Sequence, residues 1–210
     1  MKIAVCMKQV PSSEARIVIG PSGTAIDSTD VEMVINPYDE YAVEEALRIR
    51  DARGAGEVII VTVGSEKAQT EIRKCLAMGA DRGVIVQDAA YLGGDGLATA
   101  RILADVIGDL QPDLVLCGKL SIDVENDLVG VALAEHLDWP HVSLVNKIEW
   151  GEGGRAKVHR EIEGGTEVVA LTLPAVLTTE KGLNEPRYAS LKGIMAAKRK
   201  PIEAVVPKIS

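Results

Sequence analysis

Short runs of β-branched and other apolar residues alternate, over the first two thirds of this chain, with longer stretches in which apolar residues recur every three or four positions. The short runs predict buried strands at residues 3–7, 58–63, 83–86 and 114–117. The longer stretches predict amphipathic helices at residues 39–50, 66–78, 97–107 and 128–137. Strands joined by such crossover helices are typical of a doubly wound α/β fold with a mostly parallel sheet.

The pattern changes after Pro140. Four strand-like segments, separated by glycine-rich or proline-containing turns, lie at residues 141–150, 156–163, 166–172 and 175–179. They predict β-hairpins that extend the parallel sheet at its edge or pair beside it. Residues 17–26, between the first strand and the first helix, predict another small hairpin.

The last residues have no apolar face of their own and predict an arm. We therefore expect one α/β domain over residues 1–182, followed by a recognition loop and a short C-terminal arm over residues 183–210.

Charge and composition exclude several functions. The excess of 31 acidic over 23 basic residues, a net charge of −8, argues against a protein that coats nucleic-acid phosphates. Cys6, Cys75 and Cys117 are odd in number and far apart, which argues against a disulfide framework and favours a reducing compartment. The three histidines share no metal-ligand spacing, and no stretch approaches the roughly 18 apolar residues of a membrane span. We expect a soluble, metal-free chain with neither a phosphate-binding loop nor a hydrolase elbow.

The topology indicates where a ligand binds. In open α/β sheets, ligands lie beyond the carboxyl ends of the strands, which here are followed by residues 6–9, 63–65 and 118–127. Asn36 and Pro37 form a helix start, with Asn36 as the cap and Pro37 in the first helical position. Asp127 would serve as the N-terminal cap of the helix at residues 128–137.

Five motifs, in order, carry a specific likeness to a known family. They lie at residues 7–11, 36–48, 76–82, 137–140 and 183–191, and the last reads Leu-Asn-Glu-Pro-Arg-Tyr-Ala-Ser-Leu. With these motifs the chain resembles, over nearly its whole length, the β subunit of electron transfer flavoproteins.

The resemblance implies a Rossmann-like domain, similar to adenine nucleotide alpha hydrolases, which carries electrons as part of a complex and is not itself an enzyme. It implies a heterodimer whose α subunit holds the redox-active FAD, while the β subunit holds AMP. Electrons would come from flavin dehydrogenases such as acyl-CoA dehydrogenases, as in fatty acid oxidation, and would pass to a quinone-reducing or other acceptor. The compartment would be the prokaryotic cytoplasm, or the mitochondrial matrix in a eukaryote.

The resemblance also implies roles for individual residues. Tyr38 would lie close to the flavin of the α subunit, and Glu161 would hold the mobile flavin domain in a productive orientation. Leu191, with Arg187 and Tyr188, would dock the dehydrogenase. The implied cofactor-binding residues are Cys6, Asn36, Pro37, Tyr38, Asp39, Val63, Gly118, Ile122, Asp123, Asn126, Asp127, Leu128 and Val129.

The chain departs from the family pattern in two places. Members that bind AMP place amide and hydroxyl side chains where this chain has Asp127, Leu128 and Val129, which offer no donors to a phosphate. AMP, a second FAD of an electron-bifurcating member, and no nucleotide at all remain alternatives for the cleft. The chain also ends sooner than the family's arm usually does. An alternative function is a nucleotide-sensing α/β module that has lost electron transfer.

Overall fold

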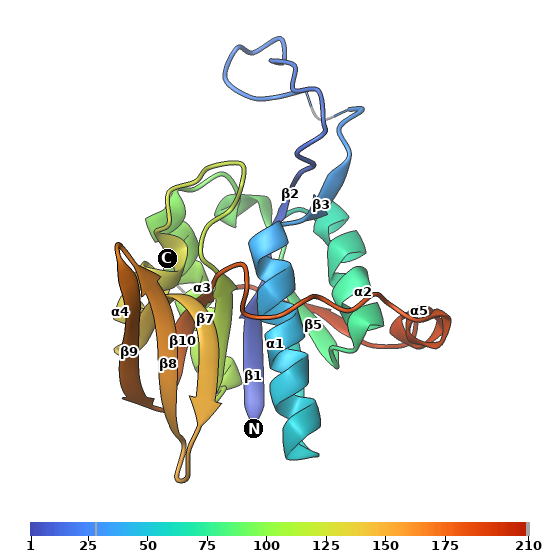
Figure 1. Ribbon diagram of the computed structural model, residues 1–210. Coiled ribbons are helices and arrows are strands. Elements are labelled where there is room, and N and C mark those ends of the chain that lie inside the picture. Colours follow the sequence, from blue (N-terminus) through green and yellow to red (C-terminus); the bar gives the residue numbers. More distant parts are fainter. Residues whose placement is uncertain (28, 209–210) are drawn as a thin grey trace.

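The computed structural model describes residues 1–27 and 29–208. A nine-stranded sheet in the order β11-β5-β4-β1-β6-β10-β7-β8-β9 forms its centre, and the first seven of these strands run parallel (Figure 1). The strands are β1 (Lys2–Cys6), β4 (Glu57–Val63), β5 (Arg82–Val86), β6 (Leu114–Gly118), β7 (His141–Trp150), β8 (Arg155–Ile162), β9 (Gly165–Thr172), β10 (Ala175–Thr179) and β11 (Ile202–Ala204).

Helices cover both faces of this sheet. They are α1 (Pro37–Arg53), α2 (Gln69–Met78), α3 (Gly96–Leu110), α4 (Val129–Leu137) and α5 (Leu191–Ala197), with short 3-10 turns η1 (Glu66–Ala68) and η2 (Ala89–Tyr91). Along β1, Ile3 and Val5 join the core under α1 and α2, whereas Ala4 and Cys6 join the core under α3 and α4. The four predicted strands and their crossover helices are confirmed. The apolar runs predicted the strands correctly because a strand covered by helices on both faces must be apolar on both faces.

The end of the sheet differs from the sequence-based expectation at one strand. β10 does not extend the edge but lies between β6 and β7, parallel to both. All five of its residues, Ala175–Thr179, are buried, as is expected of a central strand. Only β7, β8 and β9 form the expected antiparallel extension, which ends the sheet.

The predicted hairpin at residues 17–26 is also corrected. That segment holds a single bridge between Ile19 and Ile26, and none of its described residues belongs to a strand. The regular pairing lies at the base of the excursion instead, where β2 (Gln9–Pro11) pairs with β3 (Met33–Ile35). Figure 1 shows the excursion projecting beyond the carboxyl ends of the central strands.

The C-terminal arm packs onto its own domain. α5 lies against α2, and β11 pairs with β5 as the other edge of the sheet. A side chain at Gly193 would collide with the carbonyl oxygen of Ala77, so glycine allows the close approach of these helices. Lys200 Nζ donates to the carbonyl oxygens of Leu76 (3.0 Å) and Ala80 (2.6 Å). The arm therefore has a buried side, contrary to the expectation from the sequence.

Within residues 1–27 and 29–208, no helix is both long enough and apolar enough to cross a bilayer.

Candidate ligand cleft and exposed tail

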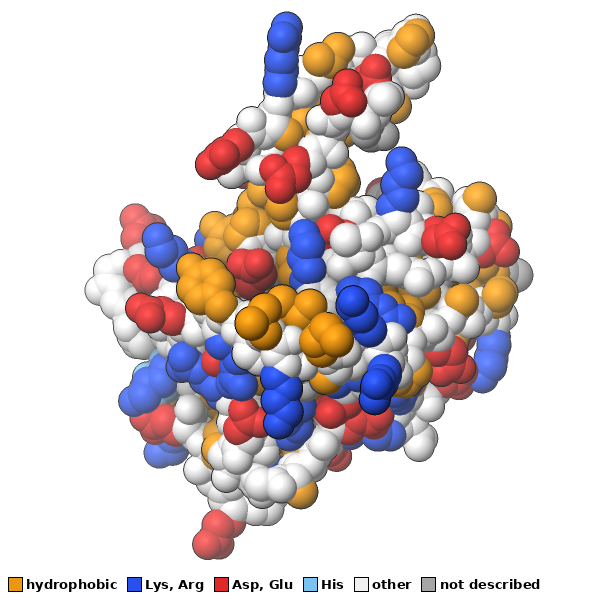
Figure 2. Space-filling view, turned by 90° about the vertical axis from the view of Figure 1, so that its right-hand side faces the viewer, with side chains coloured by type: hydrophobic (Ala, Val, Ile, Leu, Met, Phe, Trp, Pro, Cys, Tyr) orange, Lys and Arg blue, Asp and Glu red, His pale blue; other side chains and the backbone are white. Residues whose placement is uncertain are grey.

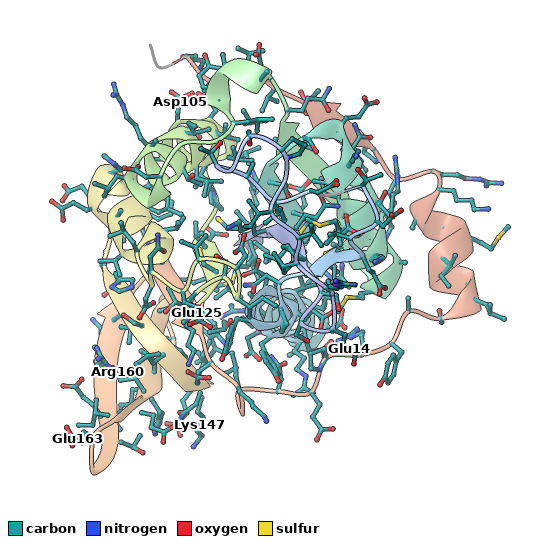
Figure 3. All side chains as sticks on the ribbon, turned by 90° about the horizontal axis from the view of Figure 1, so that it is seen from above. Glu14, Asp105, Glu125, Lys147, Arg160 and Glu163 are labelled. Atoms are coloured by element: carbon teal, nitrogen blue, oxygen red, sulfur yellow. The ribbon has the colours of Figure 1, made fainter. Side chains whose placement is uncertain are left out.

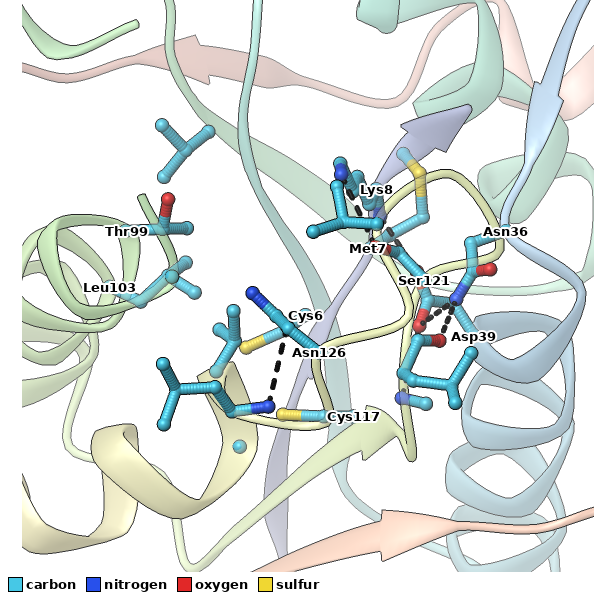
Figure 4. Close-up of a pocket in the computed structure, with 18 of the residues that line it drawn as sticks. Cys6, Met7, Lys8, Asn36, Asp39, Thr99, Leu103, Cys117, Ser121 and Asn126 are labelled. Carbon is cyan, nitrogen blue, oxygen red and sulfur yellow. Dashed lines mark hydrogen bonds between the residues drawn. The ribbon is translucent and has the colours of Figure 1, made fainter. Parts of the chain in front are cut away.

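A cavity of about 420 Å³ lies at the carboxyl ends of β1, β4 and β6, between the first turns of α3 and α4 (Figure 4). This is the edge where the topology predicts ligand binding. Eight of the thirteen predicted cofactor-binding residues line it: Cys6, Asn36, Asp39, Val63, Gly118, Asn126, Leu128 and Val129. The other five, Pro37, Tyr38, Ile122, Asp123 and Asp127, are not part of its lining.

Asn36 ties the start of α1 to the loop after β6. Its Nδ2 donates to Asp39 Oδ1 (3.0 Å) and to the carbonyl oxygen of Leu120 (2.8 Å). Its Oδ1 accepts from the backbone N–H of Ile122 at 3.2 Å. Asn36 occupies the cap position, as predicted, but its side chain makes no capping hydrogen bond. The prediction that Asn36 caps the helix with its side chain is wrong. The amide nitrogen and the amide oxygen of Asn36 both form hydrogen bonds with the loop after β6 instead.

Asp39 is the buried centre of this cluster. Its Oδ2 accepts from the backbone N–H of Lys8 (2.8 Å), and its Oδ1 accepts from that of Gly118 (3.0 Å). Burial raises the pKa of Asp39 to about 7, because the loss of hydration outweighs these hydrogen bonds. A Cβ at Gly118 would collide with the side chains of Asp39 and Tyr38, so only glycine fits there. One carboxyl group thus joins the ends of β1 and β6 to α1.

Both lysines that line the cavity are paired with carboxylates. Lys8 Nζ lies 2.8 Å from both carboxylate oxygens of Asp123 and 3.3 Å from Ser121 Oγ. Lys119 Nζ lies 2.6 Å from Glu180 Oε2 and 4.8 Å from the centre of the Tyr38 ring. The cavity therefore has no unpaired lysine among its lining residues.

The entry to α4 differs from the expected cap. Leu128 occupies the N-cap position, and Asp127 precedes it with a left-handed φ of 49°. A capping residue needs extended dihedral angles at the position before the helix, so the predicted cap at Asp127 is wrong. The nearest side-chain bond is from the N–H of Leu128 to Asn126 Oδ1, at 3.4 Å. Burial raises the pKa of Asp127, and Lys119 partly opposes this shift.

Two thiols lie on the floor of the cavity. Cys6 and Cys117 follow Val5 and Leu116, which are partners in the parallel register of β1 and β6. Cys6, Cys117 and Asn126 all belong to the lining of the cavity and are labelled in Figure 4. A hydrogen bond with Cys6 and burial raise the pKa of the Cys117 thiol well above its ordinary value. The Cys117 thiol on this floor therefore stays protonated at neutral pH.

The sequence analysis missed one wall of the cavity. Residues 92–96, together with Thr99 and Leu103, line it from the start of α3. Asp95 caps this helix, with its Oδ1 accepting from the N–H of Ala98 at 2.9 Å. The sequence signal was Gly93, Gly94 and Gly96 around Asp95, in the segment between the third predicted strand and the third predicted helix.

Residues 183–190, here called the strap, fasten the tail to α1. Arg187 Nε donates to Glu44 Oε2 (2.8 Å), and its Nη1 donates to Asp51 Oδ2 (3.0 Å). Glu44 is only 3% exposed, and these hydrogen bonds and charges lower its pKa against the effect of burial. Asn184 Nδ2 donates to Tyr41 O and to Glu45 Oε2, both at 3.0 Å. Arg187, predicted to dock a partner, is thus engaged with its own domain.

The apolar side chains next to the strap point outward. Tyr188 is 99% exposed, Leu191 is 84% exposed, and Met195 follows on α5 at 64%. Figure 2, which faces the side carrying α5, shows hydrophobic side chains at the centre of this surface with lysine and arginine side chains beside them. Leu191 is the first residue of α5, and Ser190 caps that helix through the N–H of Gly193 at 3.0 Å.

Glu161 lies far from this tail. It is exposed on β8, opposite Thr166 of β9. The neighbouring Arg160 pairs with Glu167 at 3.6 Å rather than with Glu161. Figure 3, seen from above, places Arg160 and Glu163 on the β7–β9 extension, Glu125 near the middle, and α5 at the opposite end of the molecule. The structure therefore brings the cleft residues together and keeps Glu161 and Leu191 apart.

Comparison with known proteins gives a consistent result. The family model described as "Electron transfer flavoprotein domain" matches residues 23–210. A Bradyrhizobium diazoefficiens protein named "Electron transfer flavoprotein subunit beta" is 43% identical over 202 residues, which cover 96% of this chain and 80% of that protein. Proteins of the same name from Homo sapiens and Bacillus subtilis are each 41% identical, covering 99% and 97% of this chain and 82% and 78% of their own lengths.

Proposed function

Because the chain belongs to the electron transfer flavoprotein family as a β subunit, we propose that it supports a flavin-bearing α subunit and docks a flavin dehydrogenase through its tail. β subunits of this family are electron-carrier subunits, not enzymes, and they pair with an α subunit. The donor in this proposal is a flavin dehydrogenase of the acyl-CoA dehydrogenase kind. The acceptor is a quinone-reducing protein.

The exposed Leu191 beside a fixed strap is the observation that carries the docking proposal. Protein interfaces take most of their binding energy from a few apolar or aromatic anchors surrounded by polar residues. Leu191 and Tyr188 are almost fully exposed, and Arg187 holds the backbone next to them through the buried Glu44. An anchor on a fixed backbone loses little conformational freedom on binding. The tail therefore supports a protein partner with an apolar pocket.

The redox cofactor in this proposal is an FAD held mainly by the α subunit, and it supplies the electron-accepting chemistry. Tyr38 stacks with Lys119 outside the cavity, at the start of α1. The Lys119 ammonium group forms a cation–π contact with the Tyr38 ring. The backbone carbonyl of Tyr38 accepts a hydrogen bond from Thr179 Oγ1 at 3.0 Å. A ring fixed in this way can pack against a flavin presented by a partner without rearranging.

In this proposal Glu161 orients a mobile flavin-bearing domain, and its exposure supports that role. It is exposed on the sheet extension, and no salt bridge involves it among residues 1–27 and 29–208. A carboxylate without a local cation can attract a basic side chain of another domain, although an exposed ion pair of this kind is worth only about 0.2–1 kcal/mol. Such a weak contact suits an orientation that must form and break repeatedly.

The function is tested by co-expressing the full chain with an electron transfer flavoprotein α subunit from the same organism and purifying the chain through a tag. We expect a yellow heterodimer that a flavin dehydrogenase reduces, and a colourless chain when it is expressed alone. Tight, stoichiometric FAD on the isolated chain would contradict the assignment of the redox flavin to α. Absence of any flavin-bearing companion would contradict the carrier function itself.

A further inference from the structure

We propose that the cleft at the carboxyl ends of β1, β4 and β6 takes an uncharged, nucleoside-sized molecule and rejects a nucleotide phosphate. The proposal rests on an apolar floor, on lysines already paired with carboxylates, and on one carboxylate at the start of each helix that faces the cavity. Asp95 caps α3, and Asp127 precedes Leu128, the N-cap residue of α4. The proposal concerns the cleft alone and is independent of electron transfer by the complex.

The size and floor of the cavity suit a planar organic ligand. Its volume of about 420 Å³ lies in the range of small-molecule sites, which are lined mainly by apolar side chains. Val61, Val63 and Leu103 surround the paired thiols of Cys6 and Cys117. A flat ring can pack on these groups without leaving a charge unpaired.

The cations of the cleft are not available to an anion. Lys8 holds Asp123 through both carboxylate oxygens, and Lys119 holds Glu180 at 2.6 Å. A phosphate group that approached either lysine would also approach the carboxylate paired with it, and that carboxylate repels the phosphate. The positive charge of each lysine is therefore largely neutralised before a phosphate arrives, which lowers the electrostatic attraction that the cleft offers to an anion.

The start of α4 opposes an anion as well. A helix N-terminus favours negative charge through the free N–H groups of its first turn. At α4 the N–H of the N-cap residue, Leu128, donates to Asn126 Oδ1 at 3.4 Å, and the first turn begins after it at Val129. Leu128 and Val129 line the cavity without a side-chain donor. Asp127 directly precedes Leu128, and its electrostatic neighbours are Lys119 and Glu180, which are paired with each other. The net charge beside this helix end is therefore negative.

The start of α3 has the same character. Asp95 lines the cavity and satisfies the free N–H of Ala98, so this helix end already holds a carboxylate. The diphosphate of a second FAD would meet the same carboxylates as the phosphate of AMP. Neither nucleotide fits the residues present.

Neutral polar groups remain to orient an uncharged ligand. Ser121 and Asn126 line the cavity from the loop between β6 and α4, and Thr99 lines it from α3. The side-chain amide of Asn126 lies so close to Gly96 that a Cβ there would approach its Nδ2 to 3.1 Å. Hydroxyl and amide groups of this kind match the hydroxyl groups of a ribose and the edge of a base.

The test is isothermal titration of the full-length chain, alone and in its complex with α, with adenosine and with AMP. We expect adenosine to bind at least tenfold more tightly than AMP. The triple variant Asp127→Asn, Leu128→Gln, Val129→Thr supplies hydrogen-bond donors at the start of α4. In this variant the ratio of the AMP dissociation constant to the adenosine dissociation constant should fall at least tenfold. Asp138→Asn removes the same charge at the other end of α4, where Asp138 is the C-cap, and should leave the ratio unchanged.

Equal or tighter binding of AMP by the unaltered chain would overturn the proposal, and so would the absence of adenosine binding at millimolar concentration. Circular dichroism and retained adenosine binding show that the triple variant is folded. A triple variant that fails to fold is replaced by Asp127→Asn alone, for which a ratio unchanged from the unaltered chain would also count against the proposal. Reduction of the complex by a dehydrogenase is measured in parallel, and its loss would bear on the carrier function rather than on the cleft.

Discussion

The cleft and the tail differ in which side chains are left without a partner in their own domain. In the cleft, Asn36, Asp39 and both lysines are bound to groups of the same domain, and the apolar floor faces inward. In the tail, Arg187 is bound to α1, while Tyr188 and Leu191 face solvent. The cleft is therefore already satisfied internally, whereas the tail leaves apolar surface that only another molecule can cover.

This difference separates stability from partner recognition. Changes among the buried polar groups of the cleft should lower the stability of the fold, because their partners lose hydrogen bonds away from water. Changes at the exposed tail side chains should leave stability alone and affect transfer between proteins. The following variants test that separation, from the largest expected effect to the smallest.

Replacement of Asp39 by Asn tests whether the buried polar groups of the cleft stabilise the fold. The amide turns an N–H₂ toward one of the backbone N–H donors, so we expect a loss of about 2–3 kcal/mol in the free energy of unfolding near pH 5. Burial raises the pKa of Asp39 in the folded chain to about 7, from 3.8. The folded state therefore binds this proton more tightly, and the stability it contributes is complete below about pH 4 and is lost as the pH rises through 7.

The deficit of Asp39→Asn should accordingly shrink between pH 5 and pH 8. Urea unfolding of both proteins across this range measures it. A deficit that grows with pH would show that the folded carboxyl group is held as the anion, and would contradict the assigned pKa.

Leu191→Ala tests the tail side. Loss of an interface anchor costs about 2 kcal/mol, or roughly a 30-fold fall in the second-order rate of electron transfer from the dehydrogenase. The melting temperature should be unchanged because the side chain is 84% exposed. Val206→Ala removes an equally apolar side chain that is 68% exposed beyond α5, and serves as the matched control. Equal rates for both variants would remove Leu191 from the docking role.

Arg187→Met tests the contact that links the tail to α1. It takes one partner from the buried Glu44, which keeps Arg48 at 2.8 Å. Because the Arg187 side chain is about a third exposed (35%), we expect a loss of about 1–2 kcal/mol of stability, together with a lower transfer rate. A double-mutant cycle with Glu44→Gln gives the coupling between them. Zero coupling would mean that the strap does not depend on this pair.

Glu161→Gln has the smallest expected effect. We expect a two- to threefold fall in the transfer rate within the heterodimer, since an exposed ion pair contributes little. Stability should change by less than about 0.5 kcal/mol. Glu163→Gln, at the neighbouring turn, removes the same charge and should have no effect. A rate that changes equally in both variants would indicate a general effect of charge.

Much of this fold follows from the sequence, since strands buried on both faces leave continuous apolar runs such as Ile3 to Cys6. β10 shows the limit: its run is equally apolar, but its place between β6 and β7 depends on tertiary contacts. The sequence correctly predicted that Asn36 and Asp39 lie at the carboxyl edge of the sheet. It could not show that the Asn36 side chain binds the loop after β6 instead of capping α1. The assignment of a cap to Asp127 failed because one left-handed residue shifts the helix start.

The most direct test of the whole account is mass spectrometry of the nucleotides released from the purified heterodimer. If the cleft rejects phosphates and the redox flavin belongs to α, one FAD is released per heterodimer, with no AMP and no second FAD. Stoichiometric AMP, or two FAD per heterodimer, would contradict the account.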